Sequence, residues 1–289
     1  MYSYLAFLGI IDGFQLLFLS IALSVLFRIE KTLNFGLAVA FTLGGYIAYE
    51  FSLLPGLPVW AAITIAVPIV ALLGILLDFV TFWPLYKKNA SVLVVMTTSL
   101  GVYFASSGIL QLFWGTEVLV IQPGPSMTFQ LAGFNITHIQ LQNLAIYIMG
   151  SLLLYSAMVL TNFGRRIRAM GENTMLASAL GFNVRKIRIA SVALAYGTMG
   201  IAGALIGREY GVSANTGLSV FLSAAVVMIV GGLVSFWPIF IAAIGLGLVK
   251  NLSLGMISDQ WQPTITFAIL VSYILYSLSK IRYPDIVKR

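Results

Sequence analysis

Long apolar stretches separated by short polar segments run through the sequence from end to end. A membrane-spanning helix needs about 20 mostly apolar residues. Nine stretches approach that length, and they cover residues 6–27, 35–54, 58–79, 91–114, 141–162, 189–207, 218–234, 238–257 and 264–280. This pattern predicts an all-α, polytopic integral membrane protein with about eight or nine transmembrane helices.

Some of these stretches contain signals for a break in the helix. The second begins with an Asn-Phe-Gly sequence at 34–36 and contains a Gly-Gly pair, and the seventh and eighth are separated only by residues 235–238. They could be full spans, half-helices or re-entrant segments, because broken backbone is tolerated at membrane depth only beside protein or water. No shift in composition marks a second domain, so residues 1–289 are expected to form a single transmembrane domain.

The composition strengthens the membrane assignment. Hydrophobic residues make up 60% of the chain and charged residues only 9%, whereas soluble domains carry about 25% charged residues. A soluble protein of this size could not bury so much apolar surface, so a soluble enzyme is excluded. The chain has no cysteine and a single histidine, His138, which rules out thiolate chemistry and a His/Cys metal cluster.

The charged residues predict the orientation in the membrane. If the nine spans alternate and the N-terminus is outside, nearly all Lys and Arg residues fall on the inner side. The acidic residues assigned to the outer side are then Asp12, Glu50, Glu117, Glu209 and Asp259. Because basic residues concentrate in cytoplasmic loops, we expect the N-terminus outside and the C-terminus in the cytoplasm.

Motifs for several kinds of chemistry are missing. The sequence has no Gly-Lys dipeptide and hence no ATP-binding P-loop, and it has no His-Glu-x-x-His motif. An ion-coupled carrier usually keeps acidic residues well inside its spans, whereas Asp12, Glu50 and Asp78 lie near predicted span ends. Asp12 is expected to act as a helix N-terminal cap. We therefore expect no enzymatic activity, and a stand-alone carrier is disfavoured.

The longest inner loop, residues 163–188, contains a short predicted helix flanked by basic residues. Asn173 or Thr174 can cap its start, and Gly181 suits a left-handed C-cap. Ala177 and Leu180, three residues apart, are expected on one face. Such a helix has the form of a docking element for a soluble partner; the alternative is an ordinary basic inner loop.

The same loop resembles that of LivH-type permease subunits of branched-chain amino-acid ABC transporters. The shared pattern consists of Gly164, Arg168-Ala169, Glu172, Ala177, Leu180-Gly181 and Asn183. The resemblance covers nearly the whole chain, with further matches at Trp83-Pro84-Leu85, Leu112-Phe113-Trp114-Gly115, Ala202-Gly203-Ala204-Leu205, Tyr210-Gly211-Val212-Ser213, Val230-Gly231-Gly232-Leu233 and Asn251-Leu252. It implies an ABC importer permease fold. The residues it implies for coupling to the ATPase are Gly164, Arg168, Glu172, Ala177, Leu180 and Gly181.

The resemblance also implies a function and a set of partners. The chain would be a permease subunit in a prokaryotic inner membrane that imports branched-chain or other hydrophobic amino acids by ATP-driven alternating access. Its partners would be two cytoplasmic ATPase subunits, a second homologous permease subunit, an extracytoplasmic substrate-binding protein and the lipid bilayer, with no nucleic acid. ATP and Mg²⁺ would bind to the ATPases, and no cofactor to this chain. Urea or short amides are alternative substrates, and a stand-alone carrier or channel is the alternative class.

Residues that could line the translocation pathway lie at the predicted helix breaks and at one intramembrane charge. They are Asn34, Phe35, Gly36, Gly231, Gly232 and Lys250. The first three could form a helix break at a gate, with the Asn side chain satisfying freed backbone groups and Gly permitting the turn, or a plain interfacial turn. Lys250 could meet a substrate carboxylate, or it could snorkel to the interface. The departures from the family pattern at Gly36-Leu37, Val234 and Lys250 bear on the substrate more than on the fold.

Two further features concern surfaces. Glu117, Arg208 and Glu209 are assigned to the outer side, where charges could orient a docking binding protein or simply be solvated. Small residues at three- and four-residue spacing on the sixth span predict close helix packing. These residues are Gly197, Gly200, Gly203, Ala204 and Gly207. The neighbouring helix could belong to this chain or to a second subunit.

Overall fold

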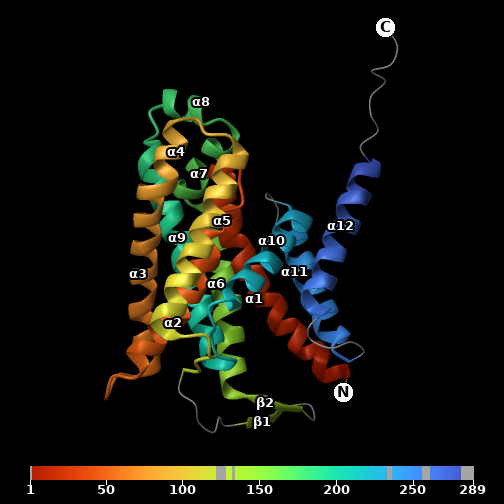
Figure 1. Ribbon diagram of the computed structural model, residues 1–289. Coiled ribbons are helices and arrows are strands. Elements are labelled where there is room, and N and C mark those ends of the chain that lie inside the picture. Colours follow the sequence, from red (N-terminus) through yellow and green to blue (C-terminus); the bar gives the residue numbers. More distant parts are fainter. Residues whose placement is uncertain (1, 122–127, 132–133, 233–235, 256–260, 281–289) are drawn as a thin grey trace.

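The computed structural model describes residues 2–121, 128–131, 134–232, 236–255 and 261–280. They form helices and one small hairpin (Figure 1). The elements are α1 (Tyr2–Glu30), α2 (Gly36–Ser52), α3 (Val59–Leu77), η1 (Asp78–Phe82), α4 (Trp83–Lys87), α5 (Val92–Trp114), β1 (Thr128–Leu131), β2 (Phe134–Thr137), α6 (His138–Leu160), α7 (Asn162–Glu172), α8 (Thr174–Ala179), α9 (Val184–Glu209), α10 (Thr216–Gly231), α11 (Phe236–Ser253) and α12 (Gln262–Lys280).

A helix lies at each of the nine predicted stretches. Six helices in the described part of the chain are long and apolar enough to cross a membrane, and one of them is the continuous helix Val59–Lys87 formed by α3, η1 and α4. The helices α2 and α10 are shorter, with 17 and 16 residues. The Gly-Gly pair does not interrupt α2, whereas α10 and α11 are separate helices.

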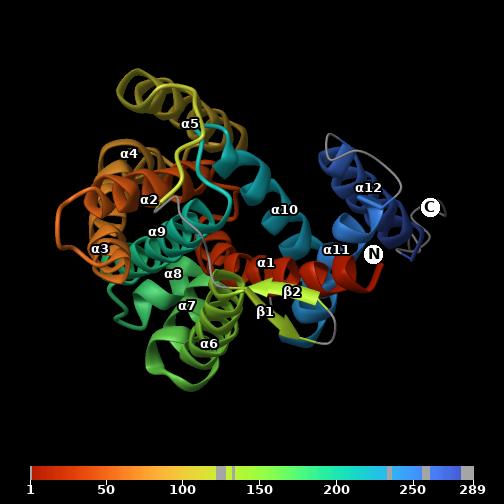
Figure 2. The ribbon, with the colours of Figure 1, turned by 90° about the horizontal axis from the view of Figure 1, so that it is seen from below.

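Two helices, α1 and α9, occupy the centre of the molecule. Figures 1 and 2 show α9 between α2, α3 and α6, while α10 and α11 lie along α1 and α12 lies outermost. Fully buried side chains such as Leu19 and Leu23 of α1 and Tyr196 and Leu205 of α9 form the core. The outer helices α3, α5 and α6 instead expose large apolar side chains, as expected for surfaces that face lipid.

Glycines bring α2 and α9 into direct backbone contact. Gly44 of α2 lies against the backbone of Gly200, and Gly203 of α9 lies against the Phe41 carbonyl, so neither glycine leaves space for a Cβ atom. Gly200 also packs on the Val70 side chain of α3. The predicted close packing of the sixth span is therefore confirmed, and the neighbouring helices belong to this chain.

A two-stranded antiparallel hairpin lies in the segment expected to be an outer loop. Strands β1 and β2 pair in the register Phe129 to Ile136, and α6 begins directly after them at His138. The Thr137 side chain accepts a hydrogen bond from the backbone of Gln140, and the Gln140 side chain accepts one from Thr137, which makes a capping box. The hairpin was not predicted, and it adds a small β element to a fold that is otherwise helical.

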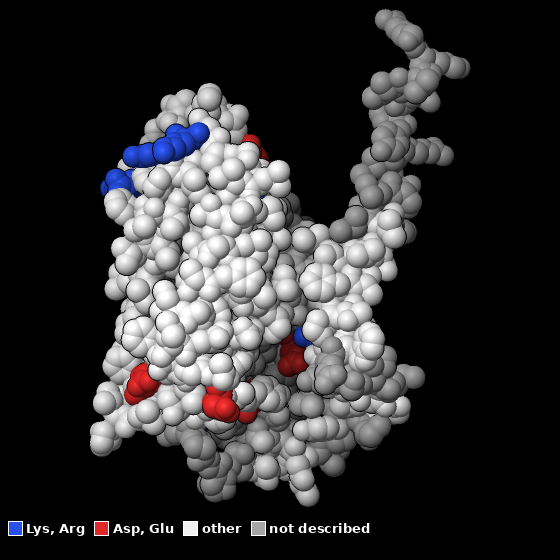
Figure 3. Space-filling view, in the orientation of Figure 1, with Lys and Arg blue, Asp and Glu red and all other residues white. Residues whose placement is uncertain are grey.

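The two ends of the molecule differ in structure and in charge. Figure 1 shows α4, α7 and α8 at one end, and the start of α1 with the hairpin at the other. In Figure 3 most of the basic side chains on the visible face gather at the α4–α8 end, and most of the acidic ones lie toward the opposite end. The described structure thus places the basic inner loop and the N-terminal helix start at opposite ends.

Candidate functional site

The predicted docking helix is α8, and its boundaries are set by the predicted caps. The Asn173 side chain accepts a hydrogen bond of 3.0 Å from the Leu176 backbone N–H. At the other end Gly181 has φ +84°, and the N–H groups of Gly181 and Phe182 donate to the carbonyls of Ser178 and Ala177. This pair of hydrogen bonds is a Schellman motif. The helix start and the left-handed glycine are both as the sequence predicts.

The two faces of α8 differ from the expectation. Ala177 is only 2% exposed and packs with Val25, Ile167 and Met170, whereas Leu180 is 67% exposed. The prediction that they share one face is therefore wrong, because Ala177 faces the protein and Leu180 is already the C-cap. The outward surface consists of Met175, Leu176 and Leu180, and we call it the α8 apolar surface. Met175 and Leu176, two adjacent large apolar residues in an otherwise basic loop, are the signal in the sequence that points to this surface.

The other predicted coupling residues hold the loop in place. The Gly164 Cα lies against the Met158 carbonyl, where a Cβ atom would not fit. The Arg168 guanidinium donates a hydrogen bond of 2.5 Å to the same carbonyl. Glu172 is exposed at the end of α7. Gly164 and Arg168 therefore fix α7 to the end of α6, and their role in ATPase coupling stays a prediction.

The loop is also tied to the end of α1. The Lys31 ammonium donates a hydrogen bond to the Gly171 carbonyl. Buried apolar side chains of α1, Val25 and Ile29, pack with Ile167 of α7 and with Ala177. A displacement of α8 would consequently change the contacts of α1, which runs through the centre of the protein.

A buried ion cluster lies beside this junction. Arg188 of α9 forms ion pairs with Asp78 at 2.5 Å and with Glu30 at 2.6 Å, and all three side chains are at most 6% exposed. Asp78 opens the π-helical segment η1, and the helix Val59–Lys87 continues beyond it; its position near a span end stays a prediction. The three charges are distant along the chain, so the sequence alone does not show that they pair.

The Asn34-Phe35-Gly36 segment joins α1 to α2 next to the ion cluster. The Asn34 amide donates to Glu30 at 3.1 Å, and its oxygen accepts the Gly36 N–H at 2.9 Å. The prediction that Asn34 satisfies freed backbone groups is confirmed. Gly36 is required for a different reason than expected, because its Cα lies against the Tyr196 hydroxyl and a Cβ atom would collide with it. A gating role for the segment stays a prediction.

The glycines at the end of α10 shape the passage to α11. Gly231 lies against the backbone of Ile239, and Gly232 ends α10 with φ +78°. The close approach and the positive φ both favour residues without a Cβ atom. Val234, the departure noted in this turn, lies outside the described residues. Lining of a pathway by the two glycines stays a prediction.

Lys250 faces a cavity at the end of the molecule opposite α8. The cavity has a volume of about 210 Å³ and lies between α10, α11 and α12. Its polar lining consists of Ser219, Ser223, Lys250, Gln262 and Thr266, and its apolar lining of Leu222, Pro263 and Phe267. The Lys250 ammonium lies 3.4 Å from the Ser223 hydroxyl. Lys250 belongs to the last turn of α11, so it is less deep in its helix than expected.

Asp12 supplies a negative charge near this cavity. It is the eleventh residue of α1, so the prediction that it caps a helix N-terminus is wrong. Its carboxylate accepts a hydrogen bond of 2.7 Å from the Asn251 amide and interacts electrostatically with Lys250. A cation of α11 and a carboxylate of α1 therefore lie close together beside the cavity.

The predicted docking charges lie in three different environments. Glu117 is exposed. The Arg208 guanidinium lies 4.8 Å from the centre of the Trp60 ring and donates to Gln142 at 2.7 Å. The Glu209 carboxylate faces α6, where it accepts a hydrogen bond of 2.7 Å from Asn143. Glu209 therefore does not face solvent as expected, and docking through these residues stays a prediction.

The comparison with known families accounts for nearly the whole chain. Residues 5–275 match the family model described as "Branched-chain amino acid transport system / permease component". The chain belongs to this permease family. The similarity first seen in the inner loop and the turn motifs is thereby confirmed, and the permease is a multi-pass membrane protein.

Individual relatives agree with the family match. The probable branched-chain amino acid transport permease protein LivH of Methanocaldococcus jannaschii is 27% identical over 234 residues, which are 78% of this chain and 72% of the relative. LivH of Escherichia coli K12, a high-affinity branched-chain amino acid transport system permease protein, is 22% identical over 286 residues, or 93% and 91% of the two chains. These relatives span most of the permease.

A solved structure shares the fold of the permease. The structure "PsaBC from Streptococcus pneumoniae in complex with Fab" superposes with a TM-score of 0.50 and covers 92% of this chain and 90% of that chain. The sequence identity is 11%. At that identity the likeness concerns the fold alone.

Proposed function

We propose that the permease is one membrane subunit of an ABC importer that moves branched-chain or other hydrophobic amino acids into the cytoplasm by ATP-driven alternating access. The observation that carries this proposal is the α8 apolar surface, Met175, Leu176 and Leu180, in a chain that belongs to the permease family. Large apolar side chains exposed on a loop helix outside the apolar spans mark a contact with another protein.

The charge distribution supports an orientation for this proposal. Basic residues gather at the end that carries α4 and α8, and basic residues concentrate on the cytoplasmic side of membrane proteins. The α8 end therefore faces the cytoplasm, and the N-terminus lies outside. The cavity beside Lys250 then opens toward the outer side, where a binding protein would deliver the solute.

The proposed assembly contains partners that this chain does not supply. Two cytoplasmic ATPase subunits bind ATP and Mg²⁺, and one of them contacts the α8 apolar surface. A second homologous permease subunit completes the pathway, and an extracytoplasmic binding protein docks at the outer end near Glu117. The permease itself holds no cofactor and carries out no covalent chemistry.

The cavity beside Lys250 supports an amino acid as the transported solute. The Lys250 ammonium in the lining can bind a carboxylate, and Asp12, which lies near Lys250 but outside the lining, can attract an ammonium group, so the two charges match those of a zwitterion. Leu222 and Phe267 supply apolar surface for the side chain. Urea or a short amide is neutral and would not require this pair of charges, which favours the amino acid.

Helix α1 connects the two functional ends in this proposal. Its inner end is bonded to the α7–α8 loop through Lys31, and its outer half carries Asp12. When the ATPases close on ATP, movement of α8 shifts α1 and alters the environment of the cavity. Coupling through a rigid helix is the simplest way to relate two sites so far apart.

Uptake competition tests the substrate class directly. The complete transporter in proteoliposomes is given labelled leucine with an excess of unlabelled isoleucine, phenylalanine, urea or acetamide. We expect the hydrophobic amino acids to compete and the neutral amides to have no effect. Competition by urea or acetamide alone would overturn the amino acid assignment and support the alternative substrate.

A further inference from the structure

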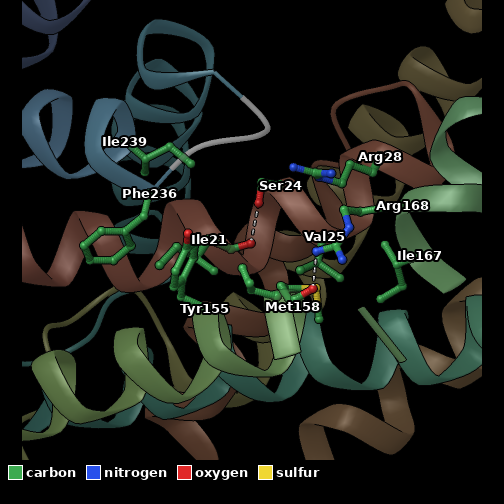
Figure 4. Close-up of a pocket in the computed structure, with 11 residues that line it drawn as sticks. Ile21, Ser24, Val25, Arg28, Tyr155, Met158, Ile167, Arg168, Phe236 and Ile239 are labelled. Carbon is green, nitrogen blue, oxygen red and sulfur yellow. Dashed lines mark hydrogen bonds between the residues drawn. The ribbon is translucent and has the colours of Figure 1, made fainter. Parts of the chain in front are cut away.

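A second pocket lies at the α8 end of the molecule, away from the cavity beside Lys250. It is formed by α1, α6, the start of α11 and α7, and Figure 4 shows its lining. Two arginines, Arg28 of α1 and Arg168 of α7, lie at one side of it. The opposite side is apolar and is formed by Ile21, Tyr155, Phe236 and Ile239.

The charges in this pocket are not balanced by its own lining. No carboxylate is among the described residues that form it. Within the described part of the chain the Arg28 guanidinium has no hydrogen-bond partner, and Arg168 donates only to the Met158 carbonyl. The charged groups that act on Arg28 are Arg168, which repels it, and Glu172. Two cations therefore share one site and leave unused hydrogen-bond donors.

The pocket continues to the outer surface of the helix bundle. Val159 of α6 is 40% exposed and belongs to the same lining. The pocket has a volume of about 40 Å³, so it can admit the phosphate of a phospholipid whose acyl chains stay outside, against the apolar surface of the bundle. Basic pockets between transmembrane helices on the cytoplasmic side bind anionic lipid headgroups in this way.

We propose that this pocket binds the phosphate of an anionic phospholipid of the inner leaflet, held by Arg28 and Arg168, with the acyl chains outside the pocket against the exposed side of α6 at Val159. The planar guanidinium groups suit a phosphate because each can donate two parallel hydrogen bonds. The site joins α1 to α7 at their arginines, so a bound lipid stabilises the junction between the α8 loop and the core. The lipid site rests on the membrane orientation given with the proposed function, but it does not depend on any transport step.

Retention of phospholipid by the purified protein tests the proposal without a transport assay. The purified full chain is incubated with phosphatidylglycerol, phosphatidylcholine or inorganic phosphate, and bound molecules are counted by native mass spectrometry. Wild type is compared with the double variant Arg28→Gln, Arg168→Gln. The matched control is Arg165→Gln, Arg166→Gln, which removes two exposed arginines from the same loop that do not line the pocket.

We expect wild type to retain phosphatidylglycerol over phosphatidylcholine, and the Arg28/Arg168 variant to lose that retention by about tenfold or more while the control loses little. Thermal unfolding of both variants, measured without added lipid, shows whether each is folded. Equal loss in the two double variants, equal binding of both lipids, or saturation by inorganic phosphate alone would each overturn the proposal. A single replacement, Arg28→Lys, keeps the charge and is expected to retain part of the binding.

Discussion

Asn251 of α11 donates a hydrogen bond of 2.7 Å to the Asp12 carboxylate of α1, next to the cavity that contains Lys250. The contact joins α1 to α11 at the end of the molecule opposite α8. At its other end α1 is bonded to the α7–α8 loop through Lys31 and Gly171. One helix thus connects the candidate solute cavity with the candidate ATPase contact.

The two charges at the cavity are expected to act on solute binding. Replacing Lys250 by Gln should raise KM for a hydrophobic amino acid by about tenfold or more, because a charged hydrogen bond to the carboxylate is lost. Lys250→Arg should recover part of the affinity. Initial uptake rates over a range of solute concentrations give KM and the maximal rate separately. Lys88→Gln removes an exposed cation at the other end and serves as the control. An unchanged KM in Lys250→Gln would exclude it from the site.

The buried ion cluster of Arg188, Asp78 and Glu30 predicts which of two substitutions destabilises the protein more. Arg188→Gln leaves the carboxylates of Asp78 and Glu30 uncompensated and should cost about 3–5 kcal/mol. Asp78→Asn leaves Arg188 paired with Glu30 and should cost clearly less. Thermal unfolding in detergent, followed by tryptophan fluorescence, gives the order. If Asp78→Asn were the less stable of the two, the assignment of Arg188 as the only cation balancing this cluster in the described structure would be contradicted.

The contact between α2 and α9 predicts opposite outcomes for two glycines. Gly44→Ala inserts a methyl group against the Gly200 backbone and should cost about 1–3 kcal/mol. Gly101→Ala on α5 meets no atom within 4 Å, and alanine favours a helix over glycine, so it should be neutral or slightly stabilising. The same thermal measurement compares both variants. Equal stability of the two would mean that the backbones do not approach as closely as described.

The orientation can be measured because the chain has no cysteine. Single variants Lys87→Cys and Arg166→Cys place a thiol at the α8 end, and Glu117→Cys places one at the opposite end. In intact cells, we expect a membrane-impermeant maleimide to label only the Glu117 variant, and in inverted vesicles only the other two. The reverse pattern would place the N-terminus in the cytoplasm.

Much of the helical arrangement follows from simple features of the sequence. In the described part of the chain, each of the nine apolar stretches contains a helix, because length and hydropathy dominate when the solvent is lipid. Asn173 and Gly181 were predictable as caps because capping depends on one side chain and one backbone angle. The small residues of α9 likewise pointed to close packing.

Features that depend on tertiary contacts could not be obtained in the same way. Arg188 is more than a hundred residues from both Asp78 and Glu30 along the chain. The cluster is therefore visible only once α1, η1 and α9 are packed. The orientation of α8 depends on which of its faces meets α1, and this decides that Ala177 is buried and Leu176 exposed. The hairpin β1–β2 is short, and its alternation of apolar and polar residues spans only four residues on each strand.

The α8 apolar surface provides the sharpest test of the proposed coupling. Leu176→Asp places a charge on the exposed surface without touching the packing, whereas Ala177→Asp places the same charge in the buried cluster with Val25 and Met170. Both are expressed with the two ATPase subunits and the binding protein, and ATP-dependent leucine uptake into proteoliposomes is measured with the amount of folded permease.

We expect Leu176→Asp to insert and fold as wild type does but to reduce ATP-dependent uptake about tenfold or more, as for the loss of a central interface residue. Ala177→Asp should instead lower the amount of folded protein. Full ATP-dependent uptake by Leu176→Asp would contradict the assignment of α8 as the ATPase contact.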